Sequence, residues 1–192
     1  MRIAFGTPIL LLLGCICAAQ TSVSNEQSQN HHNTVLEVTA VDFDTAWQQG
    51  YVYIKVQSDG IVESQILKRK SGDTRFEKAD VVAAKGTLST SELRQLNALL
   101  ARGDTLHLKT TYKQGALAVV DAGTWWDIQI PRDDRAQQIH VVAFAPDLAK
   151  AAKHPYPKAL LALGCTIEKI RAETVGEKLN TDTECNKVPS VP

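Results

Sequence analysis

The sequence LSTSELRQLNALL (residues 88–100) decides the fold, because it predicts both a helix and the side of that helix that is buried. Ser89 and Glu92 have the spacing of a capping box, in which each side chain accepts a hydrogen bond from the backbone N–H of the other residue. Leu88 and Leu93 stand at the two hydrophobic staple positions around that box. Further leucines recur at helical spacing, so we expect a helix over about 90–101 whose apolar side packs against a sheet.

The residues before this helix have the period-two pattern of strands. In the stretch from Gly50 to Gln57, Val52, Ile54 and Val56 alternate with polar residues and tyrosines. This alternation predicts one buried and one solvated face, with Tyr51 and Tyr53 on the solvated one. Ser58-Asp59-Gly60 is typical of a turn, because glycine tolerates a positive φ and aspartate bonds its own backbone. Further strands are expected over 35–43 and 61–69, and a mixed stretch reaches residues 81–82.

A second series of strands and a second helix follow. Strand patterns cover 106–112, 116–120, 124–130 and 138–144, and the last helix begins near Pro157. Short strands joined by tight turns imply antiparallel pairing. We therefore predict an α+β fold: an antiparallel β-sheet with two helices packed on one face. The order allows two βββα units, at roughly 34–103 and 104–175.

The first nineteen residues have the plan of a secretory signal peptide, with Arg2 as the only charged side chain before an apolar run. Cleavage after Ala19 would leave a periplasmic or secreted protein. Alternatively, Leu12-Leu13-Gly14-Cys15 resembles a bacterial lipobox, in which Cys15 is lipidated and anchors a lipoprotein to the membrane. The apolar run is shorter than the roughly 20 residues that span a bilayer, and no later segment is more apolar, so no transmembrane span is expected.

Export changes how Cys165 and Cys185, the two cysteines outside the first nineteen residues, are interpreted. Two cysteines in an exported chain predict one disulfide bond. The alternative is a redox or metal site, but the spacing is not CxxC and no histidine lies between them. Cys165 falls on the side of the last helix opposite its apolar stripe. The bond would therefore hold a C-terminal tail, residues 176–192, across the outside of that helix.

Composition favours one domain with a solvated surface. The chain has 192 residues, with 21 basic and 21 acidic side chains. This balance gives no electrostatic basis for binding nucleic acid or an anionic membrane. Residues 20–33 are polar and predict a flexible linker, in which His31 and His32 are more simply solvated than metal-binding. A single domain over 34–175 remains, and we expect it to be a monomer without a cofactor.

Catalytic motifs are absent: the sequence has no GxSxG elbow, HExxH, P-loop or GxGxxG. His107 and His140 fall on the polar faces of predicted strands. If those strands were neighbours, the two imidazoles and Asp127 could form a metal or acid–base site, and the protein would be a hydrolase or metalloenzyme. Histidines on a solvated sheet face are the simpler interpretation, so the sequence favours a protein that is not an enzyme.

Trp125 is the most suggestive single residue. Its neighbour Trp126 takes the buried side of the 124–130 strand, so alternation places Trp125 outward. An exposed tryptophan favours a binding surface, to which Tyr51 and Tyr53 could contribute. If other elements cover that face, Trp125 is ordinary core. We therefore predict an exported, non-enzymatic binding or accessory domain for an unknown protein or small-molecule partner.

The stretch from Gly50 to Leu100 resembles small exported bacterial domains, and among them the emfourin-type inhibitors of thermolysin-like metalloproteases. The residues that carry the resemblance are the Ser58-Asp59-Gly60 turn and the sequence KGTLSTSELRQL over 85–96. The resemblance implies a β-hairpin followed by a capped helix, and inhibition of an extracellular protease as an alternative function. No inhibitory loop residue can be assigned from it.

Overall fold

The structure is a computed structural model that describes residues 33–41, 50–68, 79–113, 124–133, 135–144, 156–178 and 185. In this part of the chain the strands are β1 (Thr34–Val41), β2 (Gly50–Gln57), β3 (Ile61–Lys68), β4 (Asp80–Thr87), β5 (Thr111–Tyr112), β6 (Thr124–Ile130) and β7 (Gln137–Phe144). The helices are α2 (Thr90–Ala101), α3 (Gly103–Leu106) and α4 (Lys158–Val175). The predicted signal peptide, Cys15, residues 20–32 of the predicted linker and the predicted 116–120 strand lie outside the described residues.

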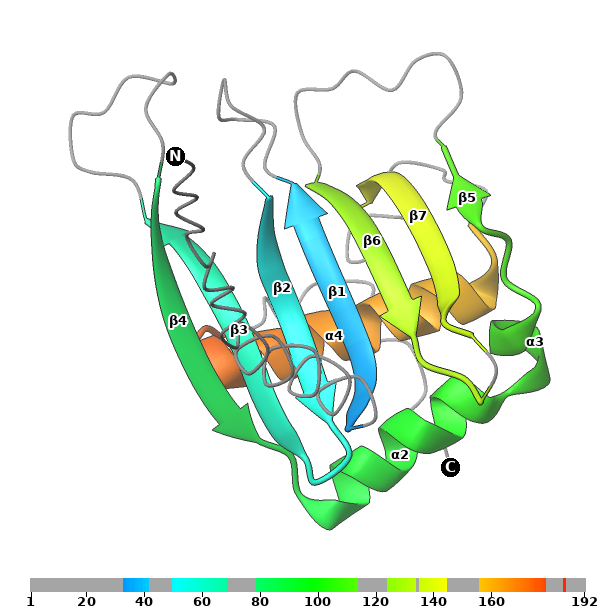
Figure 1. The fold of residues 1–192 in the computed structure, drawn as a ribbon, viewed down its shortest axis with the longest axis horizontal. Coiled ribbons are helices and arrows are strands. Elements are labelled where there is room, and N and C mark those ends of the chain that lie inside the picture. The colour runs from blue at the N-terminus through cyan, green and yellow to red at the C-terminus, as the bar shows by residue number, and fades with distance from the viewer. Residues whose placement is uncertain are drawn as a thin grey trace, which may run out of the picture.

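All seven described strands belong to one sheet, in the order β4-β3-β2-β1-β6-β7-β5 (Figure 1). Neighbouring strands are antiparallel, except that β5 pairs parallel with β7 through Thr111 and Tyr112. The fold is therefore α+β as predicted, with a sheet that is antiparallel but for one short edge strand. The first half holds four strands before its helix, because the mixed stretch over 80–87 forms β4, so the predicted pair of βββα units is wrong.

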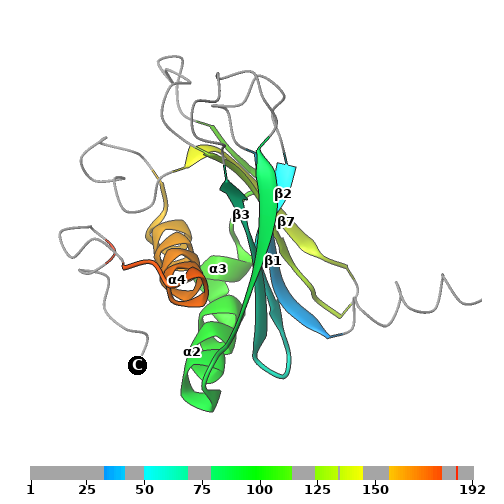
Figure 2. The ribbon, with the colours of Figure 1, turned by 90° about the vertical axis from the view of Figure 1, so that its left-hand side faces the viewer.

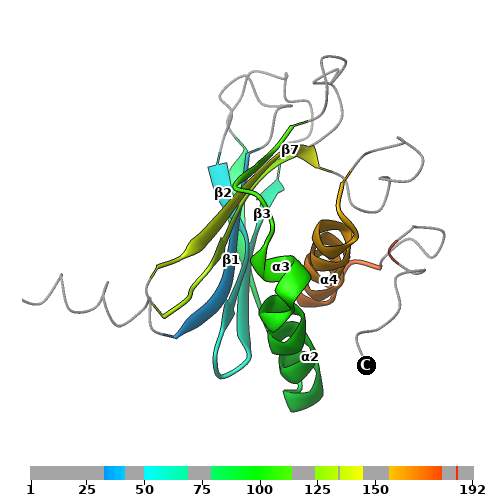
Figure 3. The same cartoon turned by 90° about the vertical axis from the view of Figure 1, so that its right-hand side faces the viewer.

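The helices lie on one face of the sheet (Figures 2 and 3). Alternate residues of β1 and β6 are 0–1% exposed beneath them, including Leu36, Val38, Trp126 and Ile128. At Gly86 of β4, an added Cβ would lie 3.1 Å from the hydroxyl oxygen of Thr174 on α4, so glycine allows a close approach there. The hydrophobic core thus occupies the single layer between the sheet and the helices.

The local signals around α2 form as predicted. Ser89 Oγ accepts from the Glu92 backbone N–H at 3.3 Å, and the Glu92 carboxylate accepts from the Ser89 N–H at 2.8 Å. In the turn between β2 and β3, Gly60 has φ +89°, and Asp59 accepts from the Ile61 N–H at 3.0 Å. Gly60 O also accepts from the Leu88 N–H at 2.9 Å, which joins this turn to the start of α2.

The predicted strand over 106–112 is mostly wrong. Residues 103–106 form the helical turn α3, and only Thr111 and Tyr112 are in a strand. Leu106 is 47% exposed, whereas Thr105 is fully buried. The short alternation of apolar residues here does not determine the backbone. The turn instead accepts a hydrogen bond from a distant residue, since Gln137 Nε2 donates to the Thr105 carbonyl oxygen at 2.9 Å.

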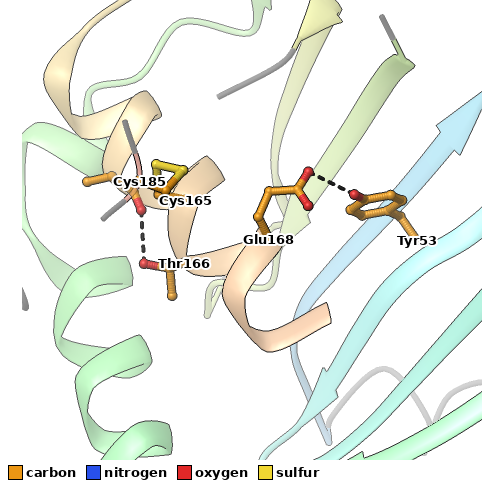
Figure 4. The surroundings of a disulfide bond; sticks show 6 residues. Tyr53, Cys165, Thr166, Glu168 and Cys185 are labelled. Atoms are coloured by element: carbon orange, nitrogen blue, oxygen red, sulfur yellow. Dashed lines mark hydrogen bonds between the residues drawn. A yellow bond between two sulfur atoms is a disulfide. The ribbon is translucent and has the colours of Figure 1, made fainter. Parts of the chain in front are cut away.

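The predicted disulfide between Cys165 and Cys185 is present, with a Cα–Cα distance of 5.0 Å. It lies on the side of α4 away from the sheet, as Figure 4 shows by comparison with Tyr53 on the other side. Of the predicted tail, only residues 176–178 and 185 are described. Among the described helices, none is long and apolar enough to cross a membrane.

Candidate functional site: the open face of the sheet

The side of the sheet opposite the helices is the candidate site, and we call it the open face. No described helix covers it (Figure 2). Strand register places alternate residues of six strands on this side. They include Glu37, Thr39, Lys55, Glu63, Lys85, Trp125, Asp127, Gln129, Gln138 and His140. Most are polar, which is the pattern of a sheet solvated on one side.

A row of alternating charges crosses the β4–β1 half of the open face. Lys85 Nζ lies 3.0 Å from a Glu63 carboxylate oxygen, and Lys55 Nζ lies 3.7 Å from a Glu37 carboxylate oxygen. Glu63 and Lys55 are themselves direct partners across β3 and β2. Each lysine in this half of the face therefore has a carboxylate beside it. Such pairs are worth about 0–1 kcal/mol each, so the row serves solubility and strand register more than stability.

The other half carries a cluster of Trp125, Asp127 and His140. Asp127 and His140 are direct partners across β6 and β7, and Asp127 Oδ1 lies 2.6 Å from His140 Nδ1. The Trp125 ring meets the His140 ring edge-on, with centroids 5.8 Å apart. The Asp127 side chain is 51% exposed and that of His140 34%, and Trp125 is partly exposed. Alternation therefore predicted the outward position of Trp125 and the burial of Trp126 correctly.

His107 does not join this cluster. His107 follows the last residue of α3, and its Nδ1 lies 2.5 Å from the carbonyl oxygen of Gly103, the first residue of that helix, because the chain is helical there and not extended. Among the described residues, no group of three His, Cys, Asp or Glu side chains is placed to hold a metal ion. The three-residue site predicted from His107, His140 and Asp127 therefore does not form. Asp127 and His140 are the pair that the structure brings together.

Tyr51 and Tyr53 are not on the open face, so their predicted position is wrong. Val38 pairs with Ile54, but the next residue of β1, Thr39, pairs with Val52, which leaves Tyr53 as an extra residue in a β-bulge. A bulge shifts the alternation of the strand by one residue. Tyr53 is consequently buried at 7% exposure, and Tyr51 packs against the core from the helix side. The period-two pattern contains no signal for this extra residue.

Tyr53 instead forms a polar contact between β2 and α4 (Figure 4). Its hydroxyl donates to a Glu168 carboxylate oxygen at 2.8 Å, and the Arg171 guanidinium lies 4.5 Å from its ring centroid. The Tyr53 ring also packs against the Trp126 ring, with the two centroids 4.8 Å apart. Burial first, and then the nearby Glu168 carboxylate, raise the pKa of the Tyr53 hydroxyl well above its usual range. The sequence analysis did not single out Glu168 or Arg171, because their spacing is that of ordinary polar residues on a surface helix.

Comparison with known proteins adds no further assignment. The chain matches no known family model and no curated protein. The resemblance to emfourin-type inhibitors therefore stays a prediction from residues 50–100. What bears on function is the geometry itself: a sheet with helices on one side, and an aromatic and acidic cluster on the other.

Proposed function

We propose that this protein is an exported, non-enzymatic binding domain whose partner contacts the open face around Trp125. The observation that carries the proposal is that Trp125 is partly exposed on a side that no described helix covers. A large aromatic side chain held there has no role in the core, which lies on the other side. Tryptophan is enriched among the residues that dominate binding energies at interfaces.

The surroundings of Trp125 favour binding over catalysis. Asp127 and His140 could orient a proton transfer, but they stand on neighbouring strands of a solvated sheet, with the Asp127 side chain half exposed. Catalytic pairs generally act in sites from which water is excluded, because electrostatic interactions are stronger there. Here the same pair more simply fixes the orientation of two polar groups that a partner can contact.

A photo-crosslinking experiment tests the proposed function. A benzophenone amino acid is placed at position 125, and in a matched variant at Arg94, which is exposed on α2. Both proteins are expressed in the native host and irradiated. We expect a defined crosslinked product from position 125 that is absent from position 94. Products from the α2 position alone, or the same products from both, would contradict the proposal. A metalloprotease as the product would support the inhibitor alternative.

The proposed location is the periplasm or the exterior, supported by the signal-like residues 1–19 and by the Cys165–Cys185 disulfide. Disulfides persist mainly in oxidising compartments. The N-terminal residue of the mature protein distinguishes a soluble exported protein from a lipid-anchored lipoprotein. Gln20 as the first residue of a soluble fraction would exclude the lipid anchor, whereas a lipid-modified Cys15 in the membrane fraction would establish it.

A further inference from the structure

The two halves of the open face differ in how their charges are balanced. In the β4–β1 half, Lys85 is paired with Glu63, and Lys55 with Glu37. In the β6–β7 half, Asp127 contacts the His140 ring, and its carboxylate has no lysine or arginine partner among the described residues. This half therefore offers a carboxylate beside a tryptophan, and no described lysine or arginine pairs with that carboxylate.

Trp125 and Asp127 stand two residues apart on the same side of β6. That spacing corresponds to about 7 Å along a strand, which is within reach of one planar cation that lies against the indole. A guanidinium stacks on an aromatic face and directs its N–H groups in a fixed fork toward a carboxylate. Both attractions act on the same group, and the second Asp127 oxygen, Oδ2, belongs to a side chain that is 51% exposed.

We propose that the partner presents a basic side chain, arginine in preference to lysine, that stacks on Trp125 and pairs with Asp127. This inference rests on the proposed function and names the chemistry of the partner. Charge complementarity argues for it: an anionic group would meet the Asp127 carboxylate, and an apolar group would desolvate the Asp127–His140 pair without replacing its contacts with water.

A titration with short blocked peptides tests the inference on the intact mature protein. The probe is acetyl-Gly-Arg-Gly-amide, and its uncharged counterpart has citrulline in place of arginine. Binding is followed by the NMR shifts of the backbone amides over 125–129 and 138–142. We expect saturable shifts with the arginine peptide and an affinity at least about fivefold weaker for citrulline, because the cation–π and ionic attractions are lost.

Two variants and a matched control locate the effect. Asp127→Asn and Trp125→Ala should each weaken arginine-peptide binding by about fivefold or more. Glu63→Gln makes the same change in net charge on the same face, beside Lys85, and should alter the affinity by less than about twofold. Thermal denaturation of each variant checks that the fold is retained.

Three outcomes would overturn the inference: equal binding of the citrulline peptide, equal weakening by Asp127→Asn and Glu63→Gln, or no saturable shift. The crosslinking result distinguishes a failure of this inference from a failure of the proposed function. A product from position 125 without arginine selectivity would leave the binding function standing and contradict the basic partner. Arginine selectivity without any crosslinked product would support the chemistry of the site and contradict the proposed function.

Discussion

Trp125 and Trp126 are adjacent in β6, yet they belong to opposite faces of one sheet. Trp126 is 1% exposed and packs against Tyr53 beneath α4, whereas Trp125 is partly exposed beside His140 on the open face. The covered face consists largely of interdigitated apolar side chains, whereas the open face carries charged pairs and other polar groups. Stability therefore depends on one face, which leaves the residues of the other available for recognition.

The largest expected effect is that of Trp126→Ala. Removing a fully buried indole should lower the free energy of unfolding by about 3–5 kcal/mol, through lost burial and the cavity left behind. The matched variant Trp125→Ala should cost about 1 kcal/mol or less, because its side chain already contacts water. Urea denaturation of both proteins measures the difference. Equal losses would show that the open face contributes to the core after all.

The disulfide on the outer side of α4 should have the next largest effect. Replacing Cys165 and Cys185 together by alanine removes a link between residues 20 apart in sequence. By the chain-entropy relation a loop of that length stabilises by about 3 kcal/mol, mainly by restricting the unfolded chain. Thermal denaturation of the double variant should match that of the reduced wild-type protein. An unchanged denaturation temperature would contradict a stabilising role for this outer link.

Tyr53→Phe tests the polar contact on the covered face. The variant keeps the ring but removes the donor to Glu168, so we expect a loss of about 2 kcal/mol near neutral pH. The control Tyr51→Phe should have a smaller effect, since Tyr51 is only partly buried. Chemical denaturation at pH 7 measures both. Equal effects would mean that the Glu168 hydrogen bond adds nothing to the stability.

The same pair of proteins should also differ in alkaline solution. Because the pKa of Tyr53 is raised in the folded state, its contribution is fully present below the unfolded tyrosine pKa of about 10. Above that pH the unfolded chain loses the proton that native Tyr53 retains, so the wild-type protein loses stability. Tyr53→Phe lacks this loss, and the stability difference between the two should shrink as pH rises beyond about 10.

A smaller effect is expected at the α2 cap. Ser89→Ala removes the side-chain acceptor for the Glu92 N–H and should cost about 1 kcal/mol. The hydrogen bonds with Ser89 lower the pKa of Glu92, so the contribution of this carboxylate is present above the unfolded pKa of about 4.3 and is lost as pH falls through the lowered folded value. Glu92→Gln should therefore make the free energy of unfolding less dependent on pH in acid solution. Glu173→Gln, which changes an exposed glutamate outside the cap, should have a smaller effect of this kind.

The smallest effect should come from the charge row of the open face. Glu63→Gln breaks the contact with Lys85, whose side chain is 72% exposed. We expect a loss of about 0.5 kcal/mol or less, which disappears at high salt. Denaturation at low and high ionic strength measures it. A loss of several kcal/mol would remove the contrast between the two faces, since the open face would then be structural.

The sequence predicted well wherever a few neighbouring residues contain the cause. The Ser89–Glu92 cap forms because both partners lie within one helical turn, and the 58–60 turn forms because Gly60 can adopt φ +89°. The inward and outward tryptophans follow from strand alternation alone. Where distant residues are involved, prediction failed: the bulge at Tyr53 arises from pairing with β1, and the helical turn at 103–106 is bonded to the Gln137 side chain of β7.

The sequence by itself determined the α+β class, the capped helix, the pairing of Cys165 with Cys185, and the outward position of Trp125. These follow from local hydrogen bonds, hydrophobic period and the number of cysteines. Only the tertiary structure decided that His140 meets Asp127 while His107 does not, and that Tyr53 turns inward to Glu168. The physical reason is that strand order and register are set by side-chain packing between segments far apart in the chain, which no short stretch of residues encodes.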